Sequence, residues 1–305
     1  IEITSLALEN KPFDYKDKSN ALRETRLDYR FLDLRREDNK LLFEVQTYIE
    51  FKMFEYWLNN GYTMLHTPKI SAAAAEGGAA VFKLDYFGTP AVLSQSPQLY
   101  KQMCMASGFN KFCEISQVYR AENSHTSYHQ TEIEMIDMEI SWVNSVHDVC
   151  DEQEAWIRYF MTALKEKYGE EIKKTFIVEV SDVSMKFPRM TFTEAKQMLK
   201  EKYNYVGEVT EDFERKEEEL IGQYAKEKYN SDFIFVVEYP YSSRPFYTMK
   251  AKDGMTQSFD LLYKGLEITS GAQRENRYDI LCEQIKEKNI PLESLAFYTE
   301  FFKYG

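Results

Sequence analysis

Hydrophobic and polar residues alternate in two runs between Lys111 and Trp142, and a polar loop without a tight-turn glycine joins these runs. In the first run, Arg120 and Glu122 project from the same side. In the second run, one side carries Ile133, Met135, Asp137 and Glu139. This period of two predicts a long antiparallel hairpin with charged groups on one face. Such a face suits a ligand with both negative and positive groups, and it is equally consistent with surface ion pairs.

Helical spacing predicts further elements on either side of the hairpin. Apolar residues three and four apart indicate a long helix over residues 39–60, with one apolar stripe from Leu42 to Trp57, and Gly61 ends it. Other helices are predicted over residues 146–168, 187–230, 275–288 and 295–304. Strands or hairpins are predicted at residues 81–93, 176–180, 233–238, 246–250 and 258–269.

Composition narrows the class of protein. At 305 residues, with 44% apolar and 15% aromatic residues, the chain can bury the core of one large domain. A formal charge of −12 argues against nonspecific nucleic-acid binding as the main role, although a local basic patch would still suit RNA. Four widely spaced cysteines without a CxxC pair predict reduced core residues rather than zinc ligands or disulfides. No apolar run approaches about 20 residues and no signal peptide opens the chain, so we expect a cytoplasmic protein and no membrane.

The central hairpin carries a motif that resembles a known family. YRAE at residues 119–122, followed by His129 at the far end of the loop and Asp137 beyond it, resembles the second signature motif of class II aminoacyl-tRNA synthetases, in their aspartyl/asparaginyl branch. Gly61-Tyr62 followed by Thr67-Pro68 resembles their first motif, which forms the dimer interface in the family. The resemblance implies an α+β catalytic fold, with a mixed, mostly antiparallel sheet flanked by helices, and a homodimer.

Two segments between these motifs resemble parts of the family's amino-acid site. SAAAAEGGAAVF resembles a loop that closes over the amino acid, and Glu76 is its only charged residue. In SQSPQLYKQM, Pro97 suits the first helical turn, so Gln98 and Lys101 would share one helical face. A lysine at the position of Lys101 resembles the aspartate enzymes of the branch. Taken alone, Lys101 also fits an ordinary surface lysine, and Glu76 a solvated loop charge.

The segment EITSGAQR resembles the part of the family that meets magnesium and ATP. The resemblance gives Glu267 and Ser270 as ligands of Mg²⁺ held against the ATP phosphates, and Arg274 as a partner of the substrate side chain. Asp260 is a weaker metal candidate, because a regular strand would turn it away from Glu267 unless a bulge intervenes. By itself, Arg274 also fits a surface ion pair.

The resemblance implies a two-step reaction. ATP and aspartate form an aspartyl-adenylate, and the acyl group then passes to tRNA(Asp). Arg120 would meet the α-phosphate, and Glu122 and His129 the nucleotide or the acceptor end. The substrate ammonium would lie among Glu76, Gln98 and Asp137. Lys101 and Arg274 would bind the substrate carboxylate, because a neutral amide would leave both as uncompensated buried charges.

Three alternatives remain open: an asparaginyl-tRNA synthetase, an asparagine synthetase-like (amidotransferase-like) relative that uses the adenylate without tRNA, and a non-catalytic module that binds tRNA or an amino acid or serves for dimerisation. The sequence departs from the family pattern in three ways. The third, glycine-rich motif is absent, because the chain ends at residues 302–305 where it would begin. Ile133 stands where many members place an adenine-stacking aromatic, and Tyr128 where the branch usually has arginine.

The domain organisation follows from the same comparison of motifs. We expect residues 1–20 to be the linker from an upstream anticodon-binding domain, because they begin like a strand and then become polar and Pro-containing. Residues 21–305 would form the synthetase catalytic domain, with residues 187–230 as a helical insertion. We therefore expect the sequence to be a fragment of a longer protein.

Overall fold

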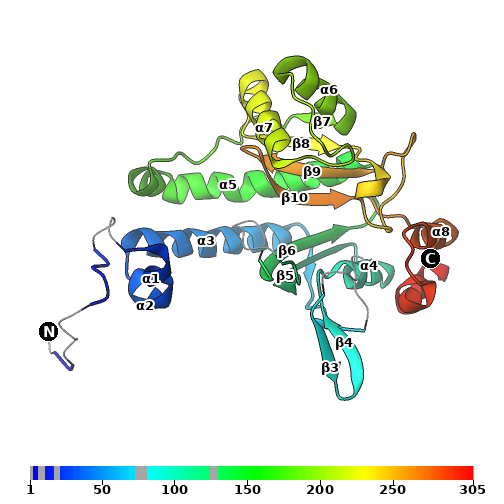
Figure 1. Ribbon diagram of the computed structural model, residues 1–305, viewed down its shortest axis with the longest axis horizontal. Helices are drawn as coiled ribbons and strands as arrows, with labels where there is room; N and C mark the ends of the chain where they lie inside the picture. The colour runs from blue at the N-terminus through cyan, green and yellow to red at the C-terminus, as the bar shows by residue number, and fades with distance from the viewer. Residues whose placement is uncertain (1–2, 6–10, 17–20, 73–80, 124–129, 305) are drawn as a thin grey trace. The chain divides into compact units, whose positions relative to one another are not determined.

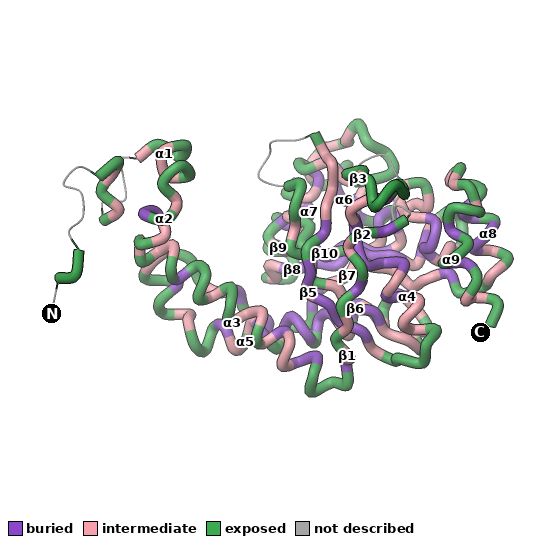
Figure 2. The backbone as a smooth tube through the Cα atoms, turned by 90° about the horizontal axis from the view of Figure 1, so that it is seen from below, coloured by how far each residue is buried: buried purple, intermediate pink, exposed green. Residues whose placement is uncertain are grey.

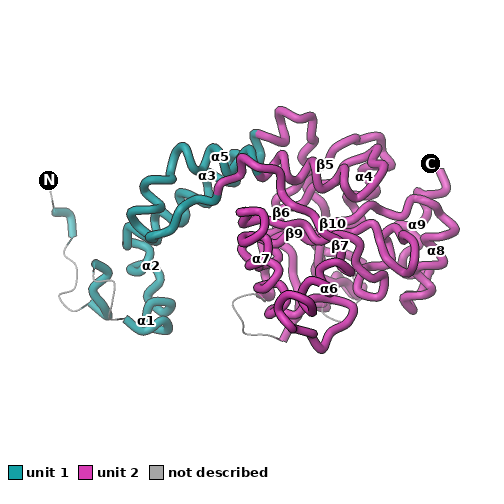
Figure 3. The backbone as a smooth tube through the Cα atoms, turned by 90° about the horizontal axis from the view of Figure 1, so that it is seen from above, with its two compact units in different colours: residues 1–55, 158–181 teal, residues 56–157, 182–305 magenta. Residues whose placement is uncertain are grey.

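The computed structural model describes residues 3–5, 11–16, 21–72, 81–123 and 130–304. These residues form two compact units, shown in different colours in Figure 3. The smaller unit contains residues 1–55 and 158–181, and the larger unit contains residues 56–157 and 182–305. Every strand that the structure describes lies in the larger unit, which therefore carries the candidate chemistry. None of the described helices combines the length and the apolar character needed to cross a bilayer.

The smaller unit is helical within the described residues. It consists of α1 (Arg23–Asp28), α2 (Arg30–Asp33), most of α3 (Glu37–Asn59) and the second part of α5 (Val146–Phe176). Tyr48 of α3 contacts Tyr168 of α5 edge to face, with ring centroids 5.5 Å apart. Asp33 is fully buried and pairs with the guanidinium groups of Arg26 and Arg30. Aromatic contacts and a buried ion-pair cluster therefore stabilise this unit.

The long helix α3 confirms the predicted helix over residues 39–60. Gly61 follows it with a φ of +76°, a backbone conformation that favours glycine and ends the helix. The predicted stripe is wrong at its start, because Leu42 is 52% exposed whereas Leu41 is buried. Trp57 lies at the buried end of the stripe and stacks on Trp156.

The strands form three sheets rather than one (Figure 1). The first contains β1 (Thr63–Met64), β5 (Lys111–Tyr119) and β6 (Glu132–Ile140) in the order β1-β5-β6. The second has the order β10-β9-β8-β7, with β7 (Arg189–Thr191), β8 (Phe233–Val237), β9 (Ser258–Tyr263) and β10 (Leu266–Ala272). The third has the order β2-β4-β3, with β2 (Ile70–Ser71), β3 (Lys83–Tyr86) and β4 (Thr89–Leu93). Among the strands of the described residues, only β1–β5 and β7–β8 pair in parallel, so the predicted α+β fold with mostly antiparallel strands is confirmed.

Helices α6 (Phe192–Tyr203) and α7 (Arg215–Tyr229) pack against the second sheet. The strand β8 is buried at all five positions (Figure 2). Apolar residues of β8 and of both helices form one core, which includes Leu199, Ile221 and Ile234. Thr191 and Glu194 form a capping box that starts α6. The predicted helices within residues 187–230 are confirmed, but the segment also supplies β7, so it belongs to the sheet's own architecture.

Three predicted strands differ in the structure. The predicted strand over residues 176–180 is wrong, because helix formers such as Glu171 and Lys174 extend α5 to Phe176. Residues 246–250 make only isolated bridges, to Arg274 and Thr256. The single strand predicted over residues 258–269 is a hairpin of β9 and β10. Its two-residue turn, Lys264–Gly265, has positive φ at both positions, as the right-handed twist of a hairpin favours.

The C-terminal segment supports the helix that carries Gln98 and Lys101. α8 (Tyr278–Glu287) is shorter than predicted, and the predicted last helix is broken into η2 (Leu292–Leu295), α9 (Ala296–Thr299) and η3 (Glu300–Lys303). Tyr298 of α9 is fully buried and donates a hydrogen bond to Gln102 of α4 (Gln98–Ala106). It shares a core with Leu99, Phe246 and Tyr247. This contact places the C-terminal segment directly behind α4.

Candidate functional site

The central hairpin has the predicted form and the predicted chemical face. Strands β5 and β6 pair antiparallel over their whole length, with Glu114 opposite Asp137 and Phe112 opposite Glu139. Opposed residues project from the same side of a sheet. Asp137 and Glu139 of β6 and the even-numbered residues of β5 therefore share one face, which leads toward Arg120 just beyond the end of β5.

Helix α4 brings a buried lysine onto this face. Pro97 occupies the N-cap position, and Gln98 and Lys101 are each only 4% exposed. The Lys101 ammonium donates to Asp137 Oδ1 at 2.8 Å and lies 3.2 Å from Glu139 Oε2. The interpretation of Lys101 as an ordinary surface lysine is therefore wrong, because the side chain is buried between two carboxylates.

Arg274, in the segment that follows β10, contacts the Glu139 carboxylate. Its Nε donates to Glu139 Oε1 at 3.1 Å, and its Nη2 donates to Gln98 Oε1 at 2.9 Å. The guanidinium also lies over the ring of Tyr247, 5.2 Å from its centroid. Lys101 and Arg274 therefore converge on Glu139, although 173 residues separate them in the sequence.

Glu139 holds the two cations together. Burial alone would raise the pKa of its carboxyl, but the positive charges of Arg274 and Lys101 outweigh burial and lower this pKa. The sequence placed Glu139 on the chemical face without assigning it a role. The alternation of β6 was the signal that could have identified it, since it shares its side of the strand with Asp137.

The charges around Glu139 correct the prediction that Lys101 and Arg274 need an acidic substrate to balance their charge. Lys101 and Arg274 are not left uncompensated without an acidic substrate, because Asp137 and Glu139 neutralise them. A substrate carboxylate must therefore compete with protein carboxylates for the two cations. Among the described residues, Asp137 Oδ2 and Gln98 Nε2 are buried without a hydrogen-bond partner. One is an acceptor suited to an ammonium and the other a donor suited to a carboxylate.

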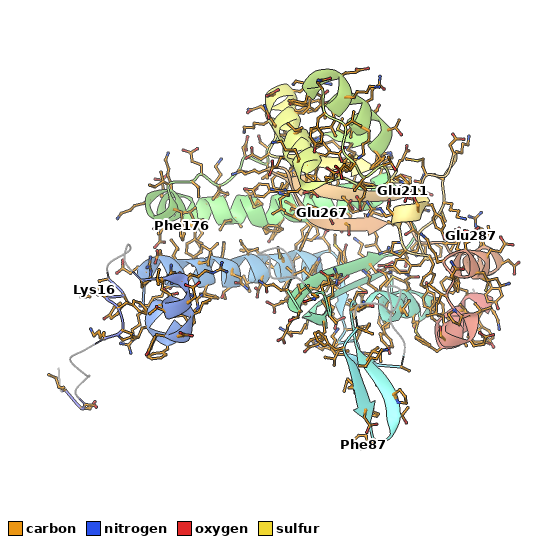
Figure 4. All side chains as sticks on the ribbon, viewed as in Figure 1. Lys16, Phe87, Phe176, Glu211, Glu267 and Glu287 are labelled. Atoms are coloured by element: carbon orange, nitrogen blue, oxygen red, sulfur yellow. The ribbon has the colours of Figure 1, made fainter. Side chains whose placement is uncertain are left out.

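A bulge in β10 brings the predicted magnesium ligands onto one side of the second sheet. Glu267 pairs with Leu262, Ser270 pairs with Asp260, and the register shifts between Glu267 and Thr269. In a regular strand, residues three apart face opposite sides. The extra residue places Glu267, Ser270 and Asp260 on the same face, and Figure 4 shows Glu267 on β10. We call Asp260, Glu267 and Ser270 the carboxylate face.

Asp260 already has a cationic partner. Arg244 donates to both of its oxygens, at 3.0 and 2.6 Å, and lies 3.8 Å from the centroid of the Tyr239 ring. Glu267 is exposed, although neighbouring protein groups partly shield its carboxyl from water. This shielding, followed by the negative charge of Asp260, raises the pKa of Glu267 to about 8, and Arg244 opposes the rise.

The donor set of the carboxylate face fits magnesium. Two carboxylates and a hydroxyl are hard oxygen ligands, and Glu267 lacks a cation of its own in the interactions described above. In the part of the chain that the structure describes, no three His, Cys, Asp or Glu side chains gather closely enough to hold a metal by themselves. An ion at this face would therefore take its remaining ligands from phosphate oxygens and water.

The other predicted site residues divide into two groups. Arg120 and Glu122 are half-buried beyond the end of β5, and the backbone N–H of Arg120 donates to Thr131 O at 3.0 Å. Ile133 lies on β6 opposite Val118. Glu76, His129 and Tyr128 lie outside the described residues. What the sequence predicted for these six residues stays a prediction.

Comparison with known proteins identifies the class. Residues 22–305 match the family model described as tRNA synthetases class II (D, K and N), so the chain belongs to this family. It is 39% identical over 308 residues to an aspartate–tRNA(Asp/Asn) ligase of Aeropyrum pernix, covering 100% of this chain and 70% of that protein. It is also 39% identical to an aspartate–tRNA(Asp) ligase of Pyrococcus horikoshii, with the same coverage.

Solved structures agree with this class. The fold superimposes on a putative aspartyl-tRNA synthetase from Leishmania major with a TM-score of 0.85 and 28% identity, covering 98% of this chain and 67% of that one. An asparaginyl-tRNA synthetase from Pyrococcus horikoshii, complexed with asparaginyl-adenylate, gives the same TM-score and identity over 93% of this chain and 65% of that one. The family resemblance and the α+β synthetase fold expected from the motifs are confirmed.

Proposed function

We propose that the chain is the catalytic part of an aspartate–tRNA ligase. It activates L-aspartate with ATP, releases pyrophosphate, and transfers the aspartyl group to the terminal ribose of tRNA(Asp). The observation that carries this proposal is the convergence of Lys101 and Arg274 on one buried carboxylate, Glu139. The names of the aspartate ligases described above support the same substrate.

In the first step, an oxygen of the aspartate α-carboxylate forms a bond to the α-phosphorus, and the bond from that phosphorus to the β-phosphate oxygen breaks. Carboxylate and triphosphate are both anions, so positioning and charge neutralisation carry the catalysis. We assign Arg120 to the α-phosphate, and Glu122 with His129 to the nucleotide or the acceptor end. No enzyme nucleophile takes part.

In the second step, a hydroxyl of the terminal ribose attacks the acyl carbon, and AMP leaves with the electron pair of the broken acyl–phosphate bond. For both steps, we assign Asp137, Gln98 and Glu76 to the ammonium group of the aspartate substrate. We assign Lys101 and Arg274 to the side-chain carboxylate of the same substrate. The buried acceptor at Asp137 Oδ2 supports this placement of the ammonium, whereas the unpaired atom of Gln98, Nε2, is a donor and suits a carboxylate of the substrate.

We assign Glu267 and Ser270 to Mg²⁺, with Asp260 beside them on the carboxylate face. When bound there, the ion neutralises phosphate charge and orients the triphosphate. The β10 bulge supports this assignment because it turns both side chains to one face.

A homodimer is part of the proposal. Apolar side chains on α3 are exposed, among them Leu42 at 52%, Phe51 at 57% and Leu58 at 66%. Exposed apolar residues along one helix are typical of a protein interface. A cytoplasmic location is also proposed, because aminoacyl-tRNA formation serves protein synthesis.

An asparaginyl enzyme is the second candidate, and the charge-balanced pocket is the observation that favours it. A neutral amide would add no charge to a cluster that Asp137 and Glu139 already neutralise. The aspartate proposal requires instead that the substrate carboxylate displace part of these contacts. This exchange is favoured only if the ammonium of the substrate takes over a protein carboxylate at the same time.

Aminoacylation of purified tRNA tests the proposal. We expect labelled aspartate to be attached to tRNA(Asp), and asparagine to be attached to neither tRNA(Asp) nor tRNA(Asn). Charging of tRNA(Asn) with aspartate would extend the substrate range. Charging with asparagine, or adenylate formation without transfer to any tRNA, would contradict the proposed function and favour one of the two enzymatic alternatives. Absence of both steps would favour a non-catalytic module.

A further inference from the structure

Arg244 contacts the carboxylate face, and the reaction outlined above gives it no role. Both oxygens of Asp260 accept hydrogen bonds from its guanidinium, at 3.0 and 2.6 Å. Asp260 is 4% exposed, so this contact is largely shielded from water. A bidentate pair between buried groups is strong, and it occupies the lone pairs that a metal ion would use.

The two partners differ in how easily they can move. Asp260 lies within β9, which pairs with β8 on one side and with β10 on the other. Arg244 lies outside the sheet, between the 3-10 turn η1 (Tyr241–Ser243) and Pro245. Its guanidinium is at the end of a long side chain. Its Nε is buried without a hydrogen-bond partner among the described residues. The carboxylate is therefore fixed by the sheet, whereas the guanidinium is held mainly through Asp260 and the Tyr239 ring.

The bulge of β10 gives this pair a functional setting. Ser270 pairs directly with Asp260, and Glu267 faces the same side. A cation that bound Glu267 and Ser270 would therefore lie beside Asp260, where the guanidinium already supplies a positive charge. Two cations at one carboxylate repel each other, and this repulsion is large in a shielded site.

We propose that Arg244 is a positioning residue of the carboxylate face that competes with the metal ion for Asp260. In the metal-free protein, Arg244 neutralises Asp260 and keeps its side chain in the orientation that the face requires. When the ion arrives, the guanidinium gives up Asp260, and the metal takes its place. This inference rests on the proposed function, because it uses the metal site assigned there.

Metal binding without nucleotide tests the competition. The probe is Mn²⁺, titrated into the protein and followed by the electron paramagnetic resonance signal of the free ion. We expect Arg244→Gln to bind Mn²⁺ about tenfold more tightly than the wild type, because the competing charge is gone. Arg244→Lys keeps a charge but loses the bidentate contact, so we expect a smaller increase. Asp260→Asn should weaken binding, and it should cancel the gain in the double variant.

A matched control separates competition from a general change in charge. Arg277 makes a bidentate pair with Glu275, at 2.7 and 2.8 Å, and both residues follow the end of β10. Arg277→Gln removes the same charge and should leave Mn²⁺ affinity unchanged. Equal or weaker binding by Arg244→Gln, or by Arg244→Lys if the first variant does not fold, would overturn the inference. Pyrophosphate exchange by the wild type, measured in parallel, shows separately whether the proposed function fails.

Discussion

Glu139 connects Lys101 and Arg274, the two cations that we assign to the substrate carboxylate. It accepts from Arg274 and contacts Lys101, and neither cation is more than 20% exposed at its side chain. A single buried carboxylate therefore fixes the separation of the two positive groups. The substrate must match that separation, so changes at any of the three residues should affect aspartate more than ATP.

Replacing Lys101 with methionine tests this directly. Lys101→Met removes one cation but keeps the length of the side chain, so we expect aspartate-dependent pyrophosphate exchange to fall roughly hundredfold or more. The free energy of unfolding should fall by about 3–5 kcal/mol, because Asp137 loses its buried partner. Lys111→Met is the control, since Lys111 pairs with Glu152 nearer the surface. Wild-type KM for aspartate in Lys101→Met would refute the role of this lysine.

The pKa of Glu139 gives a pH-dependent prediction. Burial raises this pKa, but Arg274 and Lys101 lower it below its ordinary value of 4.5. A carboxyl whose pKa is lowered by folding stabilises the protein above its unfolded pKa, and this contribution is lost as the pH falls through the folded pKa. Glu139→Gln should therefore be less stable than the wild type by about 3–5 kcal/mol at neutral pH.

The difference between these two proteins should shrink once the pH falls below 4.5. Urea unfolding of wild type and Glu139→Gln at several pH values measures it. A stability difference that stayed constant over this range would show that the ionised form of Glu139 does not stabilise the cluster.

The spacing of residues along the sequence predicted which side chains belong to the site, but it did not predict which of them contact one another. Gln98 and Lys101 could be placed on one helical face because they lie one turn apart. Their contacts with Glu139 and Arg274 join a helix, a strand and a post-strand segment that are distant in sequence. Such contacts depend on tertiary packing, which periodicity does not encode. The neutralisation of both cations by the protein was missed for this reason.

At the scale of elements, the bulge of β10 decides which side chains meet. In a regular strand of this sequence, Glu267 and Ser270 are three residues apart and would project from opposite sides, and the bulge turns them to the same side. Deleting Ile268 should restore a regular register in which Glu267 and Ser270 are two residues apart and still face the same side. We therefore expect the second sheet to stay folded and pyrophosphate exchange to stay within about tenfold of the wild type. Circular dichroism reports the fold, and the exchange reaction reports the site.

Ile268→Ala is the matched control for this deletion. The side chain is 46% exposed, so its truncation should leave both the bulge and the activity near the wild type. Loss of exchange in a deletion variant whose second sheet stays folded would contradict the assignment of Ile268 as the extra residue. Loss of activity in Ile268→Ala would instead point to the side chain.

Elements with strong periodicity were predicted well, and elements that depend on pairing were not. The β5–β6 hairpin and α3 follow from alternation and helical spacing. The short strand β7 was missed because three residues give no period, and only pairing with β8 defines it. The β9–β10 turn was missed because its Lys264–Gly265 dipeptide is a weaker turn signal than the dipeptides typical of such turns.

At the scale of the whole molecule, family membership and site geometry support the same activity. The family model spans residues 22–305, and both groups of site residues lie within that span, between Gln98 and Arg274. The aspartate pocket joins α4, β6 and the segment after β10, and the carboxylate face lies on β9 and β10. Both groups belong to the larger unit, so one compact unit carries the residues assigned to the amino acid and to magnesium.

The central claim is that Lys101 and Arg274 select an acidic substrate. ATP–pyrophosphate exchange, run with aspartate and with asparagine in separate reactions, tests it most directly, because exchange reports adenylate formation without tRNA. We expect exchange with aspartate, and a kcat/KM for asparagine that is lower than the kcat/KM for aspartate by roughly two orders of magnitude or more. Exchange with asparagine alone, or equal exchange with both amino acids, would contradict it.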